Sequence, residues 1–157
     1  CNIEGTKRRY SNARSIYSII SDIIFYMAEE NKNGKKILII DDDNFLLDMY
    51  ALKFGQNGYQ VDTALGSTVA LDKLKAGATP DVIVTDLLMP VMDGFELLEK
   101  IRDEKLVPNA KRIILPNLSQ DGDIERGNSL EVDGYIVKGS CTPSEVLEKV
   151  NKAMEQK

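Results

Sequence analysis

The sequence predicts an α/β fold: a five-stranded parallel sheet, doubly wound, with helices on both faces and an extra amphipathic helix at the N-terminus. Three observations predict it. Five short apolar runs have the length of strands, helical repeats separate them, and charged residues follow three of the runs directly. The chain has 157 residues, 43% of them hydrophobic and 29% charged, which suits one globular domain with its own core.

The N-terminal extension, residues 1–35, differs from the rest of the chain. Apolar residues recur at three- and four-residue steps over residues 16–27, after a basic start, which predicts the amphipathic helix. Ser11-Asn12-Ala13 resembles the scar left when an affinity tag is cleaved, and Met27 is a plausible natural start. Residues 1–26 are therefore either natural or foreign to the functional domain. If they are natural, the apolar stripe needs a partner, either the domain or a second copy of the helix.

The body of the chain, residues 36–157, alternates strands with helices. The first and third apolar runs are continuous, as in strands that are buried on both faces. The second run alternates between polar and apolar residues, as in a strand covered on one face. The five predicted strands cover residues 37–40, 60–64, 82–85, 112–115 and 135–137.

Helices are predicted between these strands, where apolar residues recur at helical spacing. Ser67 is expected to cap the second helix of the body, and Thr142-Pro143-Ser144-Glu145 reads as a capping box that opens the last one. The helix before the fifth strand is weak, because Gly127-Asn128-Ser129 favours turns. The predicted helices cover residues 45–56, 67–74, 95–101, 123–130 and 143 onward.

Composition excludes several classes of function. The net charge of −5 argues against a general nucleic-acid-coating role, because phosphate backbones are bound by basic surfaces. The chain has no histidine, so it contains no histidine base, histidine metal ligand or phosphohistidine. Cys1 and Cys141 form neither a disulfide framework nor a zinc signature, which predicts a reducing, cytoplasmic setting. The longest apolar stretch is interrupted by polar residues and too short to span a membrane.

Charged residues follow three of the predicted strands. Asp41-Asp42-Asp43 follows the first strand, Asp86 the third and Lys138 the fifth. The carboxyl ends of parallel strands meet at one edge of the sheet, so these groups are expected to converge. Clustered carboxylates repel each other, a divalent cation relieves that repulsion, and hard oxygen ligands favour Mg²⁺. An acid, a metal ion and an ammonium group form a site for phosphoryl transfer, with Asp86 as the better acceptor candidate.

Each element of this site has a simpler explanation. An acidic triplet after a strand is often a helix cap or a solvated turn, and a lysine after a strand is often a surface residue. Their joint placement at three strand ends makes coincidence a poor account.

The sequence resembles the receiver domain of bacterial two-component response regulators, which has a flavodoxin-like fold. The matching stretches are residues 37–43 (ILIIDDD), 81–94 (DVIVTDLLMPVMDG) and 134–138 (GYIVK), and the resemblance extends from residue 36 to about 155. It implies that Asp86 accepts the phosphoryl group. It also implies further site residues: Asp42, Asp86 and the Leu88 carbonyl as Mg²⁺ ligands, Asp41 acting mainly through water, and Lys138 on the phosphoryl oxygens.

The resemblance also implies partners. Family members take the phosphoryl group from the histidine of a kinase or phosphotransfer protein, and many accept it from small phosphodonors. Tyr135 matches the aromatic residue that turns inward on activation. The surface of residues 123–130, 135–137 and the last helix usually signals to a downstream protein. A homodimer is possible through that surface or through the N-terminal helix, and neither nucleic acid nor a membrane is an expected direct partner.

Three positions depart from the family pattern. Pro116 stands where the family carries Ser or Thr, and it offers neither a hydroxyl nor a backbone N–H. We therefore expect phosphorylation to survive while its coupling to the signalling surface is weakened. Gly139 stands where a cis proline is common, which predicts a looser loop. Glu131 stands where a helix-ending glycine is common.

Three functions remain open at this point. The leading one is a stand-alone phospho-acceptor switch that binds a partner protein and is not a turnover enzyme. The second is a pseudo-receiver, a constitutive interaction module whose switch is broken at Pro116. The third is a phosphatase of the haloacid-dehalogenase type, because Asp41-x-Asp43 has its acid spacing. That family usually continues with Gly-Thr, whereas Asn44-Phe45 follows here.

Overall fold

The computed structural model describes residues 15–30, 34–120 and 122–157, and within residues 26–30 only the backbone. The chain divides into two compact units, Cys1–Lys32 and Asn33–Lys157. In the first unit, α1 (Ile16–Glu30) confirms the predicted N-terminal helix. Its apolar side chains from Ile16 to Phe25 are exposed. Within the described ranges, no helix has both the length and the apolar character needed to cross a membrane.

The second unit is the predicted five-stranded parallel sheet, with the strand order β2-β1-β3-β4-β5. Its strands are β1 (Lys36–Asp41), β2 (Gln60–Leu65), β3 (Val82–Thr85), β4 (Lys111–Ile114) and β5 (Gly134–Tyr135). Its helices are α2 (Asn44–Gln56), α3 (Ser67–Lys75), α4 (Gly94–Asp103), α5 (Asp123–Ser129) and α6 (Pro143–Glu155), and one 3₁₀ turn, η2, covers Lys138–Ser140.

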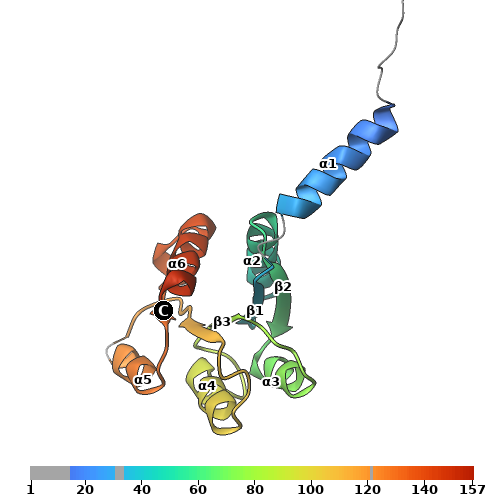
Figure 1. Cartoon of the computed structure of the whole chain (residues 1–157). Coiled ribbons are helices and arrows are strands. Elements are labelled where there is room, and N and C mark those ends of the chain that lie inside the picture. Colours follow the sequence, from blue (N-terminus) through green and yellow to red (C-terminus); the bar gives the residue numbers. More distant parts are fainter. Residues whose placement is uncertain (1–14, 31–33, 121) are drawn as a thin grey trace, which may run out of the picture. The chain divides into compact units, whose positions relative to one another are not determined.

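Helices cover both faces of the sheet, and each face has its own core. The helices α2 and α6 lie on one face, and α3, α4 and α5 lie on the other (Figure 1). One core packs Leu38, Ile83 and Ile114 against α3 and α4, and the second packs Ile39, Val84 and Ile113 against α2 and α6. The central strand β3 is buried throughout, as its continuous apolar run predicts.

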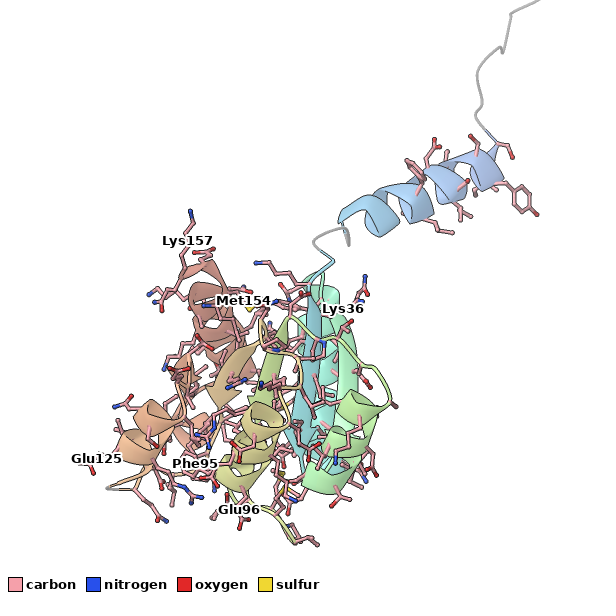
Figure 2. All side chains as sticks on the ribbon, turned by 60° about the horizontal axis from the view of Figure 1, so that its bottom comes forward. Lys36, Phe95, Glu96, Glu125, Met154 and Lys157 are labelled. Atoms are coloured by element: carbon pink, nitrogen blue, oxygen red, sulfur yellow. The ribbon has the colours of Figure 1, made fainter. Side chains whose placement is uncertain are left out.

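Capping boxes fix the starts of two helices. Thr142 and Glu145 form the predicted capping box at the start of α6. A second box, which was not predicted from the sequence, joins Asp93 and Glu96 at the start of α4. Glu96 and the neighbouring Phe95 are both labelled there in Figure 2. Both boxes satisfy backbone N–H groups that a helix start otherwise leaves unpaired.

The predicted role of Ser67 is wrong. The cap residue of α3 is Gly66, with φ 89°, and no side chain caps this helix. Ser67 is the first residue of α3, and its hydroxyl donates instead to the carbonyl oxygen of Met92, at 2.6 Å. This bond ties the start of α3 to the loop that precedes α4, which a local capping pattern does not reveal.

The fifth strand is shorter than predicted, because its regular pairing ends at Tyr135. Two more amides nevertheless continue the contact with the chain at the end of β4. Ile136 donates to the carbonyl oxygen of Ile114 at 2.9 Å, and Lys138 donates to that of Pro116 at 2.8 Å. The chain therefore stays bound to its neighbour as far as the predicted site.

Candidate functional site

Three carboxylates meet at the carboxyl end of the sheet. Asp41 ends β1, and Asp86 follows β3 directly. The register pairs Ile40 with Thr85, so the next residue of each strand, Asp41 and Asp86, emerge side by side. One oxygen of Asp41, one of Asp42 and one of Asp86 all lie within 4.8 Å of one another. Asp41 and Asp86 are buried and Asp42 is exposed, so the cluster opens to solvent on one side.

Lys138 reaches this cluster from the turn η2, which follows the edge strand β5. Its Nζ donates to Oδ2 of Asp41 at 2.7 Å and lies 3.3 Å from Oδ2 of Asp86. The lysine side chain is only 8% exposed. The structure therefore brings together Asp41, Asp42, Asp86 and Lys138, as the sequence predicted, although up to 97 positions separate them in the chain.

Burial and charge perturb both ionisable partners. Burial raises the pKa of Asp86; the nearby Lys138 charge opposes this rise, and the Asp41 charge adds to it. Burial alone lowers the pKa of Lys138, but its hydrogen bond to Asp41 and the charge of Asp86 outweigh burial and raise it overall. One ammonium faces three carboxylates, so the site keeps an excess of negative charge that favours a divalent cation.

The donor set fits a hard divalent cation. Octahedral Mg²⁺ binds oxygen at about 2.0–2.1 Å, so two of its ligands lie at most about 4 Å apart. Small side-chain rotations bring oxygens that lie within 4.8 Å of each other into that range. Leu88, whose carbonyl the resemblance adds to the set, lies two residues after Asp86 in the loop before α4. The cluster is therefore an acidic pocket of the kind that binds Mg²⁺.

Comparison with known proteins identifies the family of this chain. The family model described as the response regulator receiver domain matches residues 37–151. The chain belongs to this family. It is a receiver domain of the two-component type, and receiver domains interact with histidine kinases and with downstream effectors.

Several relatives resemble this receiver domain along its length. The chemotaxis protein CheY of Thermotoga maritima is 32% identical over 120 residues, which are 76% of this chain and 97% of CheY. The alkaline phosphatase synthesis regulator PhoP of Bacillus subtilis is 30% identical over 123 residues, 78% of this chain. The match spans only 50% of PhoP, so this chain corresponds to about half of that regulator.

Solved structures agree with this assignment. The chemotaxis protein CheY4 of Vibrio cholerae is 28% identical, with a TM-score of 0.70 over 76% of this chain and 98% of CheY4. The response regulator TrrA of Thermotoga maritima, solved in complex with Mg²⁺-BeF, is 32% identical, with a TM-score of 0.65. That alignment covers 76% of this chain and 98% of TrrA.

A cavity of about 210 Å³ adjoins the acceptor candidate of the receiver domain. Asp86, Leu88, Pro116 and Leu118 line one part of it, and Arg126 of α5 lines another. Leu88 and Leu118 are about 70% exposed, so the cavity is open at this rim. Pro116 therefore lines the same cavity as Asp86, where the resemblance expects a hydroxyl, and its side chain contains only carbon atoms.

Tyr135 lies farther along the same side of the receiver domain. Its ring is half-buried, and its hydroxyl donates to Oδ2 of Asp123 at 3.3 Å. Burial raises the pKa of Tyr135, and the Asp123 charge adds to the rise. This contact joins β5 to the first turn of α5, the two elements that follow Pro116 in the chain.

Two features of the site were missed from sequence. Arg126 lies over the ring of Phe95, with its guanidinium carbon 4.8 Å from the ring centre, and it pairs with Glu99 at 3.2 Å. Gly94 packs against Asp86 itself, because a Cβ there would lie 2.2 Å from the Asp86 carbonyl oxygen. The Asp93-Gly94 dipeptide was the available signal, since a glycine directly after a cap residue permits such a close approach.

Gly139, where a looser loop is expected, contacts the chain that follows β4. It lies in η2, and its amide donates to the carbonyl oxygen of Asn117 at 3.1 Å. A Cβ at this position would lie 2.3 Å from that oxygen. The glycine thus allows the turn beside Lys138 to pack directly against the chain that follows β4.

Proposed function

We propose that this chain is a phospho-acceptor switch in which Asp86 takes a phosphoryl group from the histidine of a kinase or phosphotransfer protein. The observation that carries the proposal is the surroundings of the Asp86 carboxylate. It lies 3.3 Å from the Lys138 ammonium, at a strand end where Asp41 and Asp42 also converge. Phosphoryl transfer to an acid requires a carboxylate acceptor, a cationic group beside it and acids that can bind a metal ion, and this site has all three.

The transfer needs one nucleophile and a site that tolerates negative charge. An Asp86 carboxylate oxygen attacks phosphorus, so that an O–P bond forms while the N–P bond of the donor breaks. The electron pair of that bond stays on the donor imidazole, which takes up a proton. Lys138 then contacts the phosphoryl oxygens and offsets their charge. Asp41 positions Lys138 for this task through their 2.7 Å hydrogen bond.

We propose that Mg²⁺ is the cofactor, held by Asp42, Asp86 and the backbone carbonyl of Leu88, with Asp41 acting through water. When bound, the ion supplies positive charge that offsets both the carboxylates and the incoming phosphoryl oxygens. The exposed position of Asp42 leaves an entry path for the ion. The relative TrrA, which was solved with Mg²⁺-BeF, supports this choice of metal.

The decisive experiment is incubation with Mg²⁺ and a small acyl phosphate, followed by mass spectrometry of the intact chain. We expect the parent to gain the mass of one phosphoryl group and Asp86→Asn to gain none. Asp72→Asn makes the same change at an exposed position of α3 and serves as the matched control, which should be phosphorylated like the parent. Phosphorylation of Asp86→Asn, or none in the parent, would refute the proposal.

The chain's own residues also argue against turnover of external substrates. In a phosphatase with an Asp41-x-Asp43 pattern, the second acid is needed in the site. Here one oxygen of Asp43 accepts hydrogen bonds from the amides of Phe45 and Leu46, at 2.8 and 3.3 Å, and so caps α2. We therefore propose that the chain only loses its own phosphoryl group. Repeated hydrolysis of an added phosphate ester by the purified chain would contradict this.

A second candidate, the constitutive pseudo-receiver, is favoured by Pro116 alone. Proline at the cavity beside Asp86 removes the hydroxyl that could sense a phosphoryl group, while the acids and Lys138 keep their contacts. Comparison of the parent with Pro116→Thr, each with and without phosphorylation, separates the two candidates. Amide NMR shifts over α5, β5 and α6 that respond to phosphorylation only in Pro116→Thr indicate a pseudo-receiver. Equal responses in both indicate an intact switch.

For an intact switch, we propose that α5, β5 and α6 form the surface that meets the downstream protein or a second copy. The supporting contact is the hydrogen bond from Tyr135 of β5 to Asp123 of α5, which any inward turn of the tyrosine must break. We place this exchange in the cytoplasm, because the donor is a histidine kinase or phosphotransfer protein.

A further inference from the structure

A basic hollow lies at the opposite end of the sheet from Asp86. It has a volume of about 570 Å³, between the end of α4, the start of β4 and the segment after α5. Its charged lining, which we call the basic pocket, consists of Arg102, Lys105, Lys111, Arg112, Glu131 and Asp133. The acceptor site lies at the carboxyl ends of the strands and this pocket at the amino ends, so the two are separate.

The positive charges of the basic pocket are only partly neutralised. Asp133 is occupied, because it accepts a hydrogen bond from the Arg112 amide at 2.8 Å and one from Lys111 Nζ at 3.4 Å. Arg102 pairs with its own neighbour Asp103 at the surface. Among the described residues, Lys105 and the Arg112 guanidinium form no ion pair. Two cationic groups therefore remain available for a ligand.

The Arg112 side chain carries the strongest indication of a missing partner. Its Nε is buried and has no hydrogen-bond partner, and it is the only such side-chain atom in the described part of the chain. A buried charged donor without an acceptor is unfavourable, because it has lost water and gained nothing in exchange. Because Nε is buried, the side chain must turn toward the pocket before an acceptor oxygen there can satisfy it, and its planar guanidinium suits the oxygens of an oxyanion.

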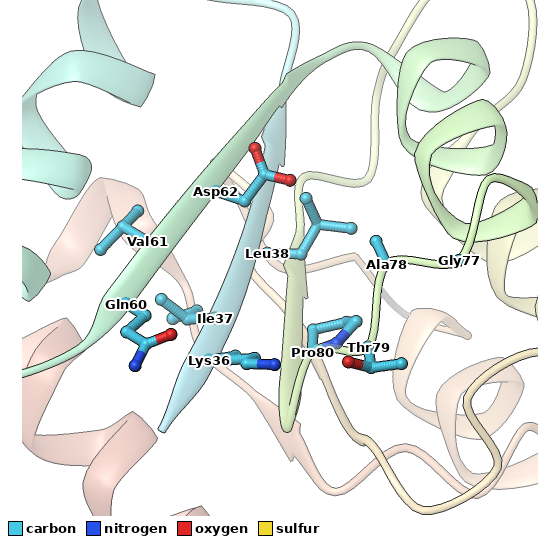
Figure 3. A pocket seen from close by; sticks show the side chains of 10 residues that line it. All are labelled: Lys36, Ile37, Leu38, Gln60, Val61, Asp62, Gly77, Ala78, Thr79 and Pro80. Atoms are coloured by element: carbon cyan, nitrogen blue, oxygen red, sulfur yellow. The ribbon is translucent and has the colours of Figure 1, made fainter. Parts of the chain in front are cut away.

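A second hollow of the same unit shows the contrast. It has a volume of about 390 Å³ beside β1 and β2, and Leu38 and Ala78 are among the residues that line it (Figure 3). Its acid, Asp62, is already paired with Lys73 of α3. Among the described residues, no buried polar side-chain atom of this second hollow lacks a partner. It therefore gives no comparable sign of a ligand.

We propose that the basic pocket binds a small phosphate-bearing molecule. Phosphate oxygens match the fork of Arg112, and the flexible Lys105 can close on the same group from the pocket's rim. The pocket's volume falls in the range of small-molecule sites and admits a diphosphate or a nucleotide. This inference is independent of phosphorylation at Asp86, because none of the pocket residues belongs to that site.

The test is a titration of the full chain with pyrophosphate and, separately, with adenosine diphosphate, in the presence of a chelator and followed by amide NMR shifts. We expect saturable binding with a Kd below about 1 mM. The shifts should be confined to the end of α4, the start of β4 and the segment after α5. Binding of both probes identifies phosphate recognition, and binding of the nucleotide alone adds recognition of the base and ribose.

Variants decide whether the basic pocket is responsible. Arg112→Gln and Lys105→Gln should each weaken binding about tenfold or more, and the exposed Lys105 decides alone if Arg112→Gln does not fold. Lys152→Gln removes the same charge from the exposed face of α6 and should leave binding unchanged, as should Asp86→Asn. No saturable binding, equal weakening in Lys152→Gln, or loss only in Asp86→Asn would overturn the proposal. Binding of an acidic peptide without either phosphate probe would also overturn it.

Discussion

Gly94→Ala is expected to damage both the fold and the acceptor site. The added Cβ would lie 2.2 Å from the Asp86 carbonyl oxygen, whereas real Cβ atoms essentially never come within 3.0 Å. Either α4 or the Asp86 backbone must therefore move by about 0.8 Å. Overpacking of this kind costs about 1–3 kcal/mol. The same movement strains the hydrogen bond from the Gly94 amide to Leu87, at 2.8 Å, so we expect a loss near the upper end of that range.

Two assays measure this effect. Urea denaturation should show the loss of stability, and phosphorylation by a small acyl phosphate should slow about tenfold or more, because a 1 Å misplacement can cost about 100-fold in rate. Gly55→Ala is the matched control, since no atom lies within 4 Å of a Cβ in the last turn of α2. It should stabilise the chain by about 0.4–1 kcal/mol. A Gly94→Ala variant that is as stable and as reactive as the parent would refute the reasoning.

Three further predictions concern stability. Glu131 has φ 55°, a left-handed conformation that costs a residue with a side chain about 1 kcal/mol. Glu131→Gly should therefore raise Tm by a few degrees, and an unchanged or lower Tm would contradict backbone strain at this position. Mg²⁺ should raise the Tm of the parent by mass action and that of Asp42→Asn much less, so equal shifts would exclude Asp42 as a ligand. Hydrogen bonds from Thr142 lower the pKa of Glu145 in the folded chain. The stabilisation that the Glu145 carboxylate contributes is therefore present above the unfolded pKa and is lost as pH falls through the lower folded pKa. The destabilisation caused by Glu145→Gln, measured by urea denaturation, should therefore shrink on acidification, and a constant difference would contradict this.

The acidic site could be predicted because parallel sheets concentrate strand ends. Asp41 ends one buried strand and Asp86 follows another. Once the two strands are recognised, the parallel topology alone brings both acids to one edge of the sheet. Lys138 follows by the same argument, although its strand is the shortest of the sheet. Such predictions depend on hydrophobic runs, which can be recognised from the local sequence. They stay correct even where the exact end of a strand is misassigned by a residue or two.

The missed features depend on contacts between distant segments. The local sequence predicts Ser67 as a helix cap, but its hydroxyl donates to the carbonyl oxygen of Met92, 25 positions away. The tight contact of Gly94 with Asp86 likewise depends on the angle at which α4 leaves its loop. Arg126 gave no signal, because an exposed arginine on a short helix looks the same whether or not an aromatic ring lies beneath it.

Two of the three departures from the family pattern, Pro116 and Glu131, fall on the segment that leads from β4 to β5. The acids and Lys138 are carried by β1, β3 and the segment after β5, and the Lys138 amide is held by the Pro116 carbonyl, an acceptor that proline retains. Replacing a hydroxyl residue by proline at position 116 therefore leaves the lysine in place. The segment between Pro116 and Tyr135, by contrast, contains the seven-residue helix α5 and, two residues beyond its end, a strained Glu131. The residues proposed for transfer and the surface proposed to respond thus lie on different segments; Pro116 and Glu131 fall on the second, whereas Gly139 directly follows Lys138.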